Sequence, residues 1–165
     1  LQSGCKTRPW RALGERLHTV IRSYDPLVYI LTSSNQHLRI SRIDKKLLEK
    51  VFSILQLFTE VFDELEKISE PTSNKVIPMV SIVRNMLKNS IDVNDTSIEQ
   101  GVINDLCNSI LNQMSLKIQT SIHQIHYAAS FLDPAFKTFD YLETPDEAIE
   151  IAKKFIIMHC LKDIV

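Results

Sequence analysis

The sequence predicts an all-α fold, a single irregular bundle of about six helices. Apolar residues recur every three or four positions along most of the 165 residues. Only three of those residues are glycine, which disfavours tight β-hairpins and glycine-rich phosphate loops. Hydrophobic residues make up 44% of the chain and charged residues 24%, as is typical of a globular protein. The length suits a single domain that spans residues 1–165.

The N-terminal region predicts two helices in succession. Apolar residues at helical spacing indicate an amphipathic helix over residues 9–23. Asp25–Pro26 is typical of an N-cap followed by a first-turn proline, so we expect a second helix to begin there. The polar run 33–36 then predicts a loop.

The strongest helical periodicity lies over residues 43–68. Its apolar stripe is wide, which predicts a helix packed centrally in the fold. The phrase Ser41-x-x-Asp44 offers a cap at the start, and Glu70–Pro71 ends the pattern.

The next two helices are predicted from caps and apolar stripes. Thr72 or Ser73 is expected to cap a helix that begins just after it, and Pro78 in the second turn of that helix should distort or shift its start and cause a bend. The predicted apolar face of this helix contains Val76, Ile77, Val80, Val83 and Leu87. Ser97 is expected to cap the following helix. The predicted apolar face of that helix contains Ile98, Val102, Leu106, Ile110 and Met114.

The C-terminal region combines one short extended segment, near Phe131, with a final helix. Asp133–Pro134 is typical of a cap and a first helical proline, and we expect its apolar neighbours, Phe131, Leu132, Phe136 and Phe139, to have a structural role. The phrase Thr144-Pro145-Asp146-Glu147 is a capping box that predicts the start of the last helix.

The distribution of charge is uneven along the chain. Residues 1–50 contain ten basic and four acidic side chains, a net charge of +6, whereas residues 51–165 contain nine and sixteen, a net charge of −7. A positive end on a nearly neutral protein suits contact with phosphates. The alternative is a solvated basic surface without a ligand.

Cysteine usage and hydropathy limit the cellular context. No apolar run reaches the length of about 18 residues that spans a bilayer, so we expect no membrane contact. The three cysteines, Cys5, Cys107 and Cys160, are too few for a disulfide framework and suit small core positions in a reducing compartment. Because the first residue is Leu1 and not methionine, we expect a piece of a longer protein.

The sequence contains no motif for catalysis or metal binding. It lacks the G-x-S-x-G elbow and the G-x-x-x-x-G-K-[ST] loop. His123 and His126 lie three residues apart, but no carboxylate or cysteine stands at a helical step to complete a zinc site. Asp63, Glu64 and Glu66 are expected on the solvent face of a helix. We therefore expect no enzyme activity, cofactor, metal or small-molecule substrate.

Four phrases along the chain together resemble one family. The first is Lys6-Thr7-Arg8-Pro9-Trp10, and the last is AASFLDPAFK at residues 128–137. Between them lie LLEKVFSIL at residues 47–55, then Pro71-Thr72-Ser73 and Val76-Ile77-Pro78. In this order they resemble hAT superfamily transposases and the transposon-derived BED-type zinc finger proteins, in the helical insertion of the RNase H-like domain. The resemblance covers nearly the whole chain.

The resemblance implies a nuclear protein that contacts DNA. In hAT transposases the tryptophan of the first phrase contacts the transposon end, so Trp10 would stack on a base while basic neighbours hold phosphates. The candidate DNA-binding residues are Lys6, Arg8, Trp10, Arg11 and Arg16. The alternative for Trp10 is a buried anchor at the start of a helix. The family's catalytic carboxylates lie outside this region, which implies a non-catalytic part of a DDE-type transposase-like protein, with any homo-oligomer formed through parts outside this chain.

Two departures from the family's phrases favour a different function. Pro9 stands between Arg8 and Trp10, and Ala135 stands where the family has arginine. Both favour a protein-interaction or self-assembly module of a domesticated transposase, acting in transcription regulation without direct DNA contact. A third hypothesis is an active transposase segment whose cleavage carboxylates lie in flanking sequence.

Overall fold

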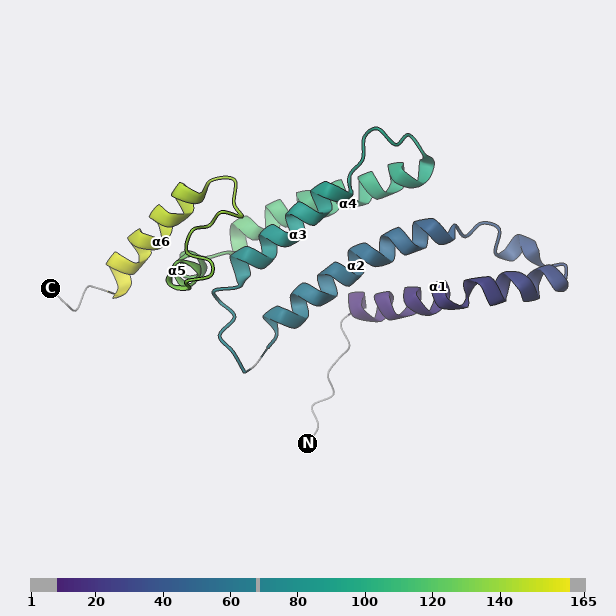
Figure 1. Ribbon diagram of the computed structural model, residues 1–165, viewed down its shortest axis with the longest axis horizontal. Coiled ribbons are helices and arrows are strands. Elements are labelled where there is room, and N and C mark those ends of the chain that lie inside the picture. The colour runs from purple at the N-terminus through teal and green to yellow at the C-terminus, as the bar shows by residue number, and fades with distance from the viewer. Residues whose placement is uncertain (1–8, 68, 161–165) are drawn as a thin grey trace. The chain divides into compact units, whose positions relative to one another are not determined.

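The computed structural model confirms the all-α fold. It describes residues 9–67 and 69–160, except for the side chains of Pro9, Trp10, Gln119 and Cys160. This described part of the chain contains six α-helices, one short 3-10 helix and no strand (Figure 1). The elements are α1 (Pro9–Ser33), η1 (His37–Arg39), α2 (Lys45–Leu65), α3 (Val76–Ser90), α4 (Ile98–Ser121), α5 (Gln124–Leu132) and α6 (Pro145–Cys160).

The chain divides into two compact units. Unit 1 is Leu1–Glu60 and contains α1, η1 and most of α2. Unit 2 is Val61–Val165 and contains the end of α2 together with α3 to α6. The boundary therefore falls inside a helix, where no glycine or proline interrupts the sequence. The single domain over residues 1–165 that the length suggests stays a prediction.

The first helix, α1, is longer than the sequence predicted. It runs from Pro9 to Ser33, so the expected break and restart at Asp25–Pro26 is wrong. Pro26 has no N–H to bond the carbonyl of Arg22, which costs about 3 kcal/mol inside a helix. The helix continues because its half-buried apolar residues keep one phase on both sides of the proline. They are Leu17, Ile21, Tyr24, Val28 and Leu31.

In unit 1, α1 and α2 run in opposite directions (Figure 1). Side chains of α1 contact α2 and the segment that leads into it. The ring of His18 stacks on that of Phe52, with 5.3 Å between the ring centroids. The hydroxyl of Tyr24 donates a hydrogen bond of 2.8 Å to the carbonyl of Ile43. A ring stack and a hydrogen bond therefore hold the two arms of the hairpin together.

Local signals set the ends of the helices in unit 1. Asn35 adopts a left-handed backbone with a φ of 60°, a conformation that asparagine tolerates and that commonly ends helices. At the start of α2, the carboxylate of Asp44 accepts the N–H of Leu47 at 2.9 Å, so Asp44 provides the cap and Ser41 does not. The helix ends at Leu65, whereas the predicted end at residue 68 lies outside the described residues.

Pro78 lies closer to the start of α3 than predicted. The helix begins at Val76, which places Pro78 in the first turn, and its N-cap is Lys75 without a side-chain cap. First-turn N–H groups have no partner inside the helix, so proline loses no bond there and the reason for the expected bend disappears. Neither Thr72 nor Ser73 caps the helix, because the start lies further along the chain than predicted.

Two other predicted starting signals are confirmed in unit 2. The side-chain oxygen of Ser97 accepts the N–H of Gln100 at 3.2 Å, which caps α4. The last helix, α6, begins at Pro145, where the missing N–H costs nothing. Both signals act within one turn of helix, which explains why the sequence alone was sufficient to find them.

The buried face of α4 differs from the predicted stripe. Ile103 and Cys107 are buried, whereas Ile98 and Val102 of the predicted stripe are exposed. The reason is that burial on α4 depends on how it packs with its neighbours, α3 among them, and not on its apolar pattern alone. Since α4 is apolar around much of its surface, periodicity identified the helix but not the face that α3 covers.

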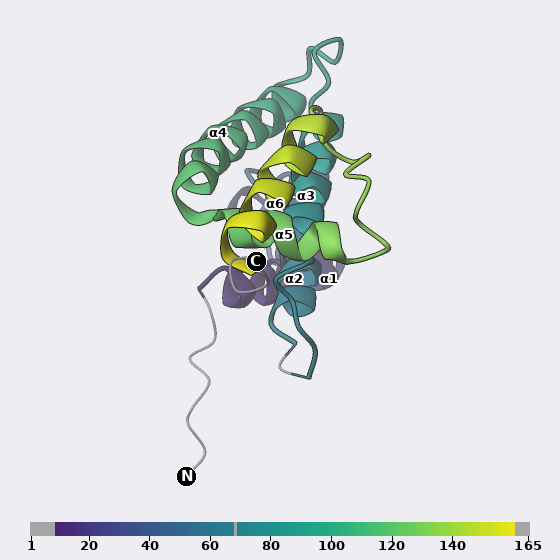
Figure 2. The same cartoon turned by 90° about the vertical axis from the view of Figure 1, so that its left-hand side faces the viewer.

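The core of unit 2 forms where α3 to α6 meet. The helix α5 packs against α6 and α3, and α3 also packs against α4 (Figure 2). Phe131 lies half-buried within α5, so the extended segment predicted near it is wrong. Leu132 is exposed rather than structural. The core cluster consists of Ile77, Phe139 and Ala148, surrounded by Ile122, Tyr127, Phe131, Tyr141, Leu142 and Ile149.

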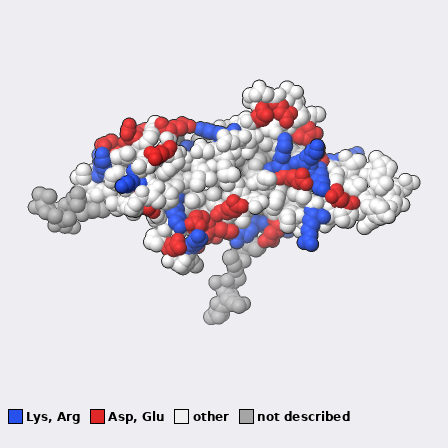
Figure 3. Space-filling view, in the orientation of Figure 1, with Lys and Arg blue, Asp and Glu red and all other residues white. Residues whose placement is uncertain are grey.

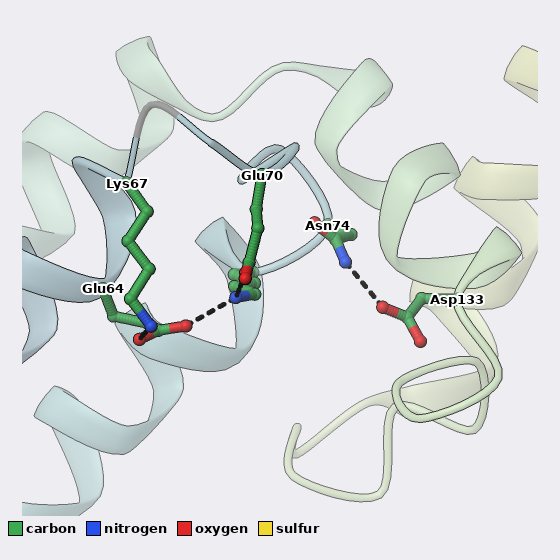
Figure 4. Close-up of polar contacts among 6 residues, drawn as sticks. Glu64, Lys67, Glu70, Asn74 and Asp133 are labelled. Carbon is green, nitrogen blue, oxygen red and sulfur yellow. Dashed lines mark hydrogen bonds and ion pairs between the residues drawn. The ribbon is translucent and has the colours of Figure 1, made fainter.

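The acidic residue of the LDPAFK phrase joins two distant segments of unit 2. The carboxylate of Asp133 accepts the side-chain amide of Asn74 at 2.5 Å and the N–H of Ala135 at 2.8 Å (Figure 4). Both hydrogen bonds hold the pKa of Asp133 below its usual value. Residues 134–138 form turns, so the helix expected to begin at Asp133–Pro134 is absent. The carboxylate of Asp133 therefore joins Asn74 to the turn at Ala135, while its backbone N–H donates to the carbonyl of Ser130 at the end of α5.

An ion-pair cluster lies where α2 passes to α3. The ammonium group of Lys75 lies 2.5 Å from the carboxylate of Glu64 and 3.1 Å from that of Glu70 (Figure 4). Lys67 also reaches Glu64, at 2.5 Å. Hydrogen bonds from Lys67 and Lys75 lower the pKa of Glu64 to about 2. This residue therefore joins the two helices electrostatically rather than facing solvent alone, as the sequence had suggested.

Candidate nucleic-acid interface

The predicted charge asymmetry coincides with the division into units. Residues 1–60 contain ten lysines and arginines and five acidic residues, a net charge of +5. Residues 61–165 contain nine and fifteen, a net charge of −6. Figure 3 shows lysine and arginine side chains gathered over α1 and α2, with acidic side chains among them. The net positive charge of the sequence therefore lies in unit 1.

The structure describes only some of the predicted DNA-binding residues. Lys6 and Arg8 lie outside the described residues. Trp10 belongs to the first turn of α1, but its side chain is not among those described, so stacking and burial of the indole both stay predictions. Arg11 is half-buried and Arg16 is exposed, both on α1. The two residues are five positions apart, which places their side chains about 140° apart around the helix axis. The structure therefore does not bring them onto one face.

Two cations that the predicted site omitted are well placed in unit 1. Arg22 is exposed and stands three turns of helix after Arg11, on the same side of α1. Lys46 is exposed in the first turn of α2. The spacing of eleven residues was the sequence signal for Arg22. Lys46 had no comparable signal, because its position depends on how the hairpin closes.

An ion pair near the turn of the hairpin brings these cations into one region. The ammonium group of Lys45 lies 2.7 Å from the carboxylate of Asp25. Asp25 stands about one turn after Arg22, and Lys46 follows Lys45, so the pair brings α1 and α2 together within one turn of each cation. Lys45 is engaged with Asp25, which raises its pKa. Arg16, Arg22 and Lys46 take part in none of the ion pairs found among the described residues.

Unit 1 also exposes an apolar surface, which we name the outer stripe. It consists of Leu13, Val20 and Leu27, seven residues apart on α1, with 48%, 37% and 40% of their surface exposed. A seven-residue spacing keeps side chains on one side of a helix. On a helical projection the outer stripe lies beside the half-buried row that contains Leu17 and Ile21, and next to Arg16. The same helix therefore presents both apolar and cationic side chains to solvent.

The two neighbouring histidines form no metal site with other described residues. Their rings lie 6.3 Å apart between centroids, His123 at the N-cap of α5 and His126 within it. Burial, and to a lesser degree the neighbouring His123, lowers the pKa of His126. Across residues 9–67 and 69–160, no group of three histidine, cysteine or acidic side chains is arranged to hold a metal ion. Cys107 is completely buried, and burial raises the pKa of its thiol.

The features above define a class of protein: an all-α chain with a cationic helical hairpin and a separately packed anionic helical unit. None of its described helices combines the length and the hydropathy needed to cross a bilayer. No protein-family model, curated protein or solved structure matches the chain.

Proposed function

We propose that unit 1 binds DNA through its cationic helices, as the helical insertion of a hAT transposase-like protein that is non-catalytic by itself. The observation that supports this function most directly is the concentration of positive charge in unit 1. Arg16, Arg22 and Lys46 are exposed and engaged in no described ion pair, so no acidic partner has to be displaced before they meet a phosphate. A nuclear location follows from the proposal.

The mechanism is electrostatic positioning of the duplex or of a DNA end. Each lysine or arginine that meets a phosphate releases a condensed counterion, which makes binding steeply weaker as salt rises. The net negative charge of unit 2 disfavours DNA on that unit. Lys6, Arg8 and Arg11 would extend the same contact towards the N-terminus, and Trp10 would add a stacking surface for an unpaired base.

Fluorescence anisotropy with labelled hairpin DNA tests this proposal. We expect the R16A/R22A/K46A variant to bind more weakly, with the slope of log affinity against log salt reduced by about 0.9 for each lost contact. The matched control is K117A/K137A/K154A, which removes three exposed cations from unit 2. The control should leave both affinity and slope close to those of the unaltered chain.

Two results would contradict DNA binding by unit 1. One is the absence of binding even at low salt, and the other is an equal loss of affinity in both triple variants. The role of Trp10 has a separate measurement, because it is the only tryptophan in the chain. Its intrinsic fluorescence should be quenched by DNA if the indole stacks on a base, and should not respond to DNA if the indole is a buried anchor.

The outer stripe favours a second candidate function, a protein-interaction or self-assembly module acting in transcription regulation. Leu13, Val20 and Leu27 form a regularly spaced apolar row, and such rows commonly mark helix-mediated association. Light scattering coupled to size-exclusion chromatography distinguishes the two functions. The interaction module is favoured over DNA binding if the chain forms oligomers and does not bind DNA, and if the L13S/L27S variant is monomeric.

A further inference from the structure

A groove in unit 2 has the size of a small-molecule site. It lies between α3, α4 and the segment that leads into α6, with a volume of about 440 Å³. Sites for small ligands typically measure about 300 to 1,000 Å³. Apolar side chains line much of it, including Ile77, Val80, Leu111 and Ile118. No sequence motif marks this groove, because its walls come from segments that are distant in the chain.

Two cations line one wall of the groove. Arg84 and Lys88 stand one turn apart on α3, so their side chains project from the same side of the helix. A guanidinium nitrogen of Arg84 lies 3.5 Å from the hydroxyl of Ser115 on α4, a weak contact that spans the groove. The ammonium group of Lys88 lies 2.5 Å from the carboxylate of Glu143.

Glu143 places a carboxylate at the cationic wall of the groove. Its hydrogen bond with Lys88, then the charges of Lys88 and Arg84, lower its pKa, so its carboxylate is in the field of both cations. Its side chain is 84% exposed. Ion pairs this exposed hold little free energy and are readily exchanged for another anion. Burial raises the pKa of Tyr141 to about 12, so this second groove residue adds no negative charge near neutral pH.

The remaining lining determines the kind of molecule that fits. When Glu143 turns away, Arg84 and Lys88 present two positive charges, which match the double negative charge of a phosphate monoester. Neutral hydrogen-bonding groups of Asn112 and Ser115 line the opposite wall, and the apolar floor suits a ring system. We propose that this groove binds a phosphate monoester of mononucleotide size, whose phosphate replaces the carboxylate of Glu143 on Arg84 and Lys88.

Isothermal titration calorimetry with adenosine 5′-monophosphate tests the proposal on the full chain. Glu143→Gln removes the competing carboxylate and should tighten binding roughly threefold, since an exposed pair is weak. Arg84→Gln should weaken binding about tenfold or more, because it removes a charged hydrogen-bond donor. Lys137→Ala, at an exposed cation of the same unit, is the control and should change nothing.

Several outcomes would overturn the proposal. If adenosine binds as tightly as its monophosphate, the groove does not recognise the phosphate. If inorganic phosphate binds as tightly as the monophosphate, the groove does not hold the nucleoside. Unchanged affinity in Glu143→Gln would show that Glu143 does not hold the ligand's place. Lys88→Gln provides a second weakening variant if circular dichroism shows that Arg84→Gln unfolds. The R16A/R22A/K46A variant should bind the monophosphate normally, so a failure here is distinct from a failure of DNA binding.

Discussion

Unit 1 and unit 2 contain similar helices but bury their apolar side chains to different degrees. In unit 1 the least exposed described side chains are Ile40, Ile54 and Leu57, at 7%, 7% and 8%. In unit 2, Leu87 and Phe139 are completely buried. A two-helix hairpin encloses little volume, whereas four packed helices surround a core from several sides. The comparison teaches that helical periodicity of equal strength does not imply equal burial.

The charge of each unit follows the same division. The hairpin has the net positive charge and the outer stripe, so its surface has both groups that attract a phosphate backbone and apolar groups that a partner covers. The four-helix part of unit 2 is self-contained and acidic. A partner that covers the outer stripe would therefore stabilise unit 1.

The largest expected effect is on the core of unit 2. Leu87→Ala should lower the free energy of unfolding by about 2 to 5 kcal/mol, because the site is fully enclosed and a cavity remains. Urea denaturation followed by circular dichroism measures the change. The control is Leu38→Ala in unit 1, whose side chain is 72% exposed, with an expected effect within about 0.5 kcal/mol. Equal costs at the two sites would break the contrast between the units.

The next largest effect is expected in unit 1 and has the opposite sign. Pro26→Ala restores an N–H inside α1 and should stabilise that helix by up to about 3 kcal/mol. Hydrogen–deuterium exchange of α1 peptides measures the gain locally. Pro145→Ala is the matched control, because the proline stands at the first position of α6 and its replacement brings no such gain. Faster exchange of α1 in the alanine variant would contradict the assignment of strain to Pro26.

A smaller effect is expected at the start of α4. Ser97→Ala removes the oxygen that accepts the N–H of Gln100 and should cost about 1 kcal/mol. The thermal midpoint should fall, and the amide hydrogens in the first turn of α4 should exchange faster. Thr96→Ala, one residue earlier, provides the control and should be nearly neutral. A cost confined to unit 2 would show that the two units unfold separately.

The smallest effect concerns pH. The pKa of Glu64 is about 2 in the folded chain and near 4.5 when unfolded, so its stabilising effect is present above pH 4.5 and is lost as the pH falls towards 2. Glu64→Gln should therefore lose less stability than the unaltered chain between pH 5 and pH 2. Urea titrations at several pH values measure the difference, which added salt should reduce. Identical pH profiles would show that the ion pairs with Lys67 and Lys75 contribute nothing.

The sequence predicted much of the helical organisation and little of the site. It located the cap at Ser97 and the start of α6 at Pro145, because such signals act over one turn. It placed a helix break at Pro26, because a local proline signal competes with an apolar seam that only packing reveals. For the candidate interface it identified Arg16 but omitted Lys46, whose position depends on how the hairpin closes.

The amino-acid sequence by itself determined the all-α class, most of the helix starts and the uneven charge, since each depends on residue type and short spacing. Only the tertiary structure decided which faces are covered and which distant groups meet. The hydrogen bond from Asn74 to Asp133 joins residues 59 positions apart, and the groove beside Arg84 exists only because α3 and α4 pack together. Local preferences act within a few residues, whereas burial depends on which elements pack together, and that is set by the whole fold.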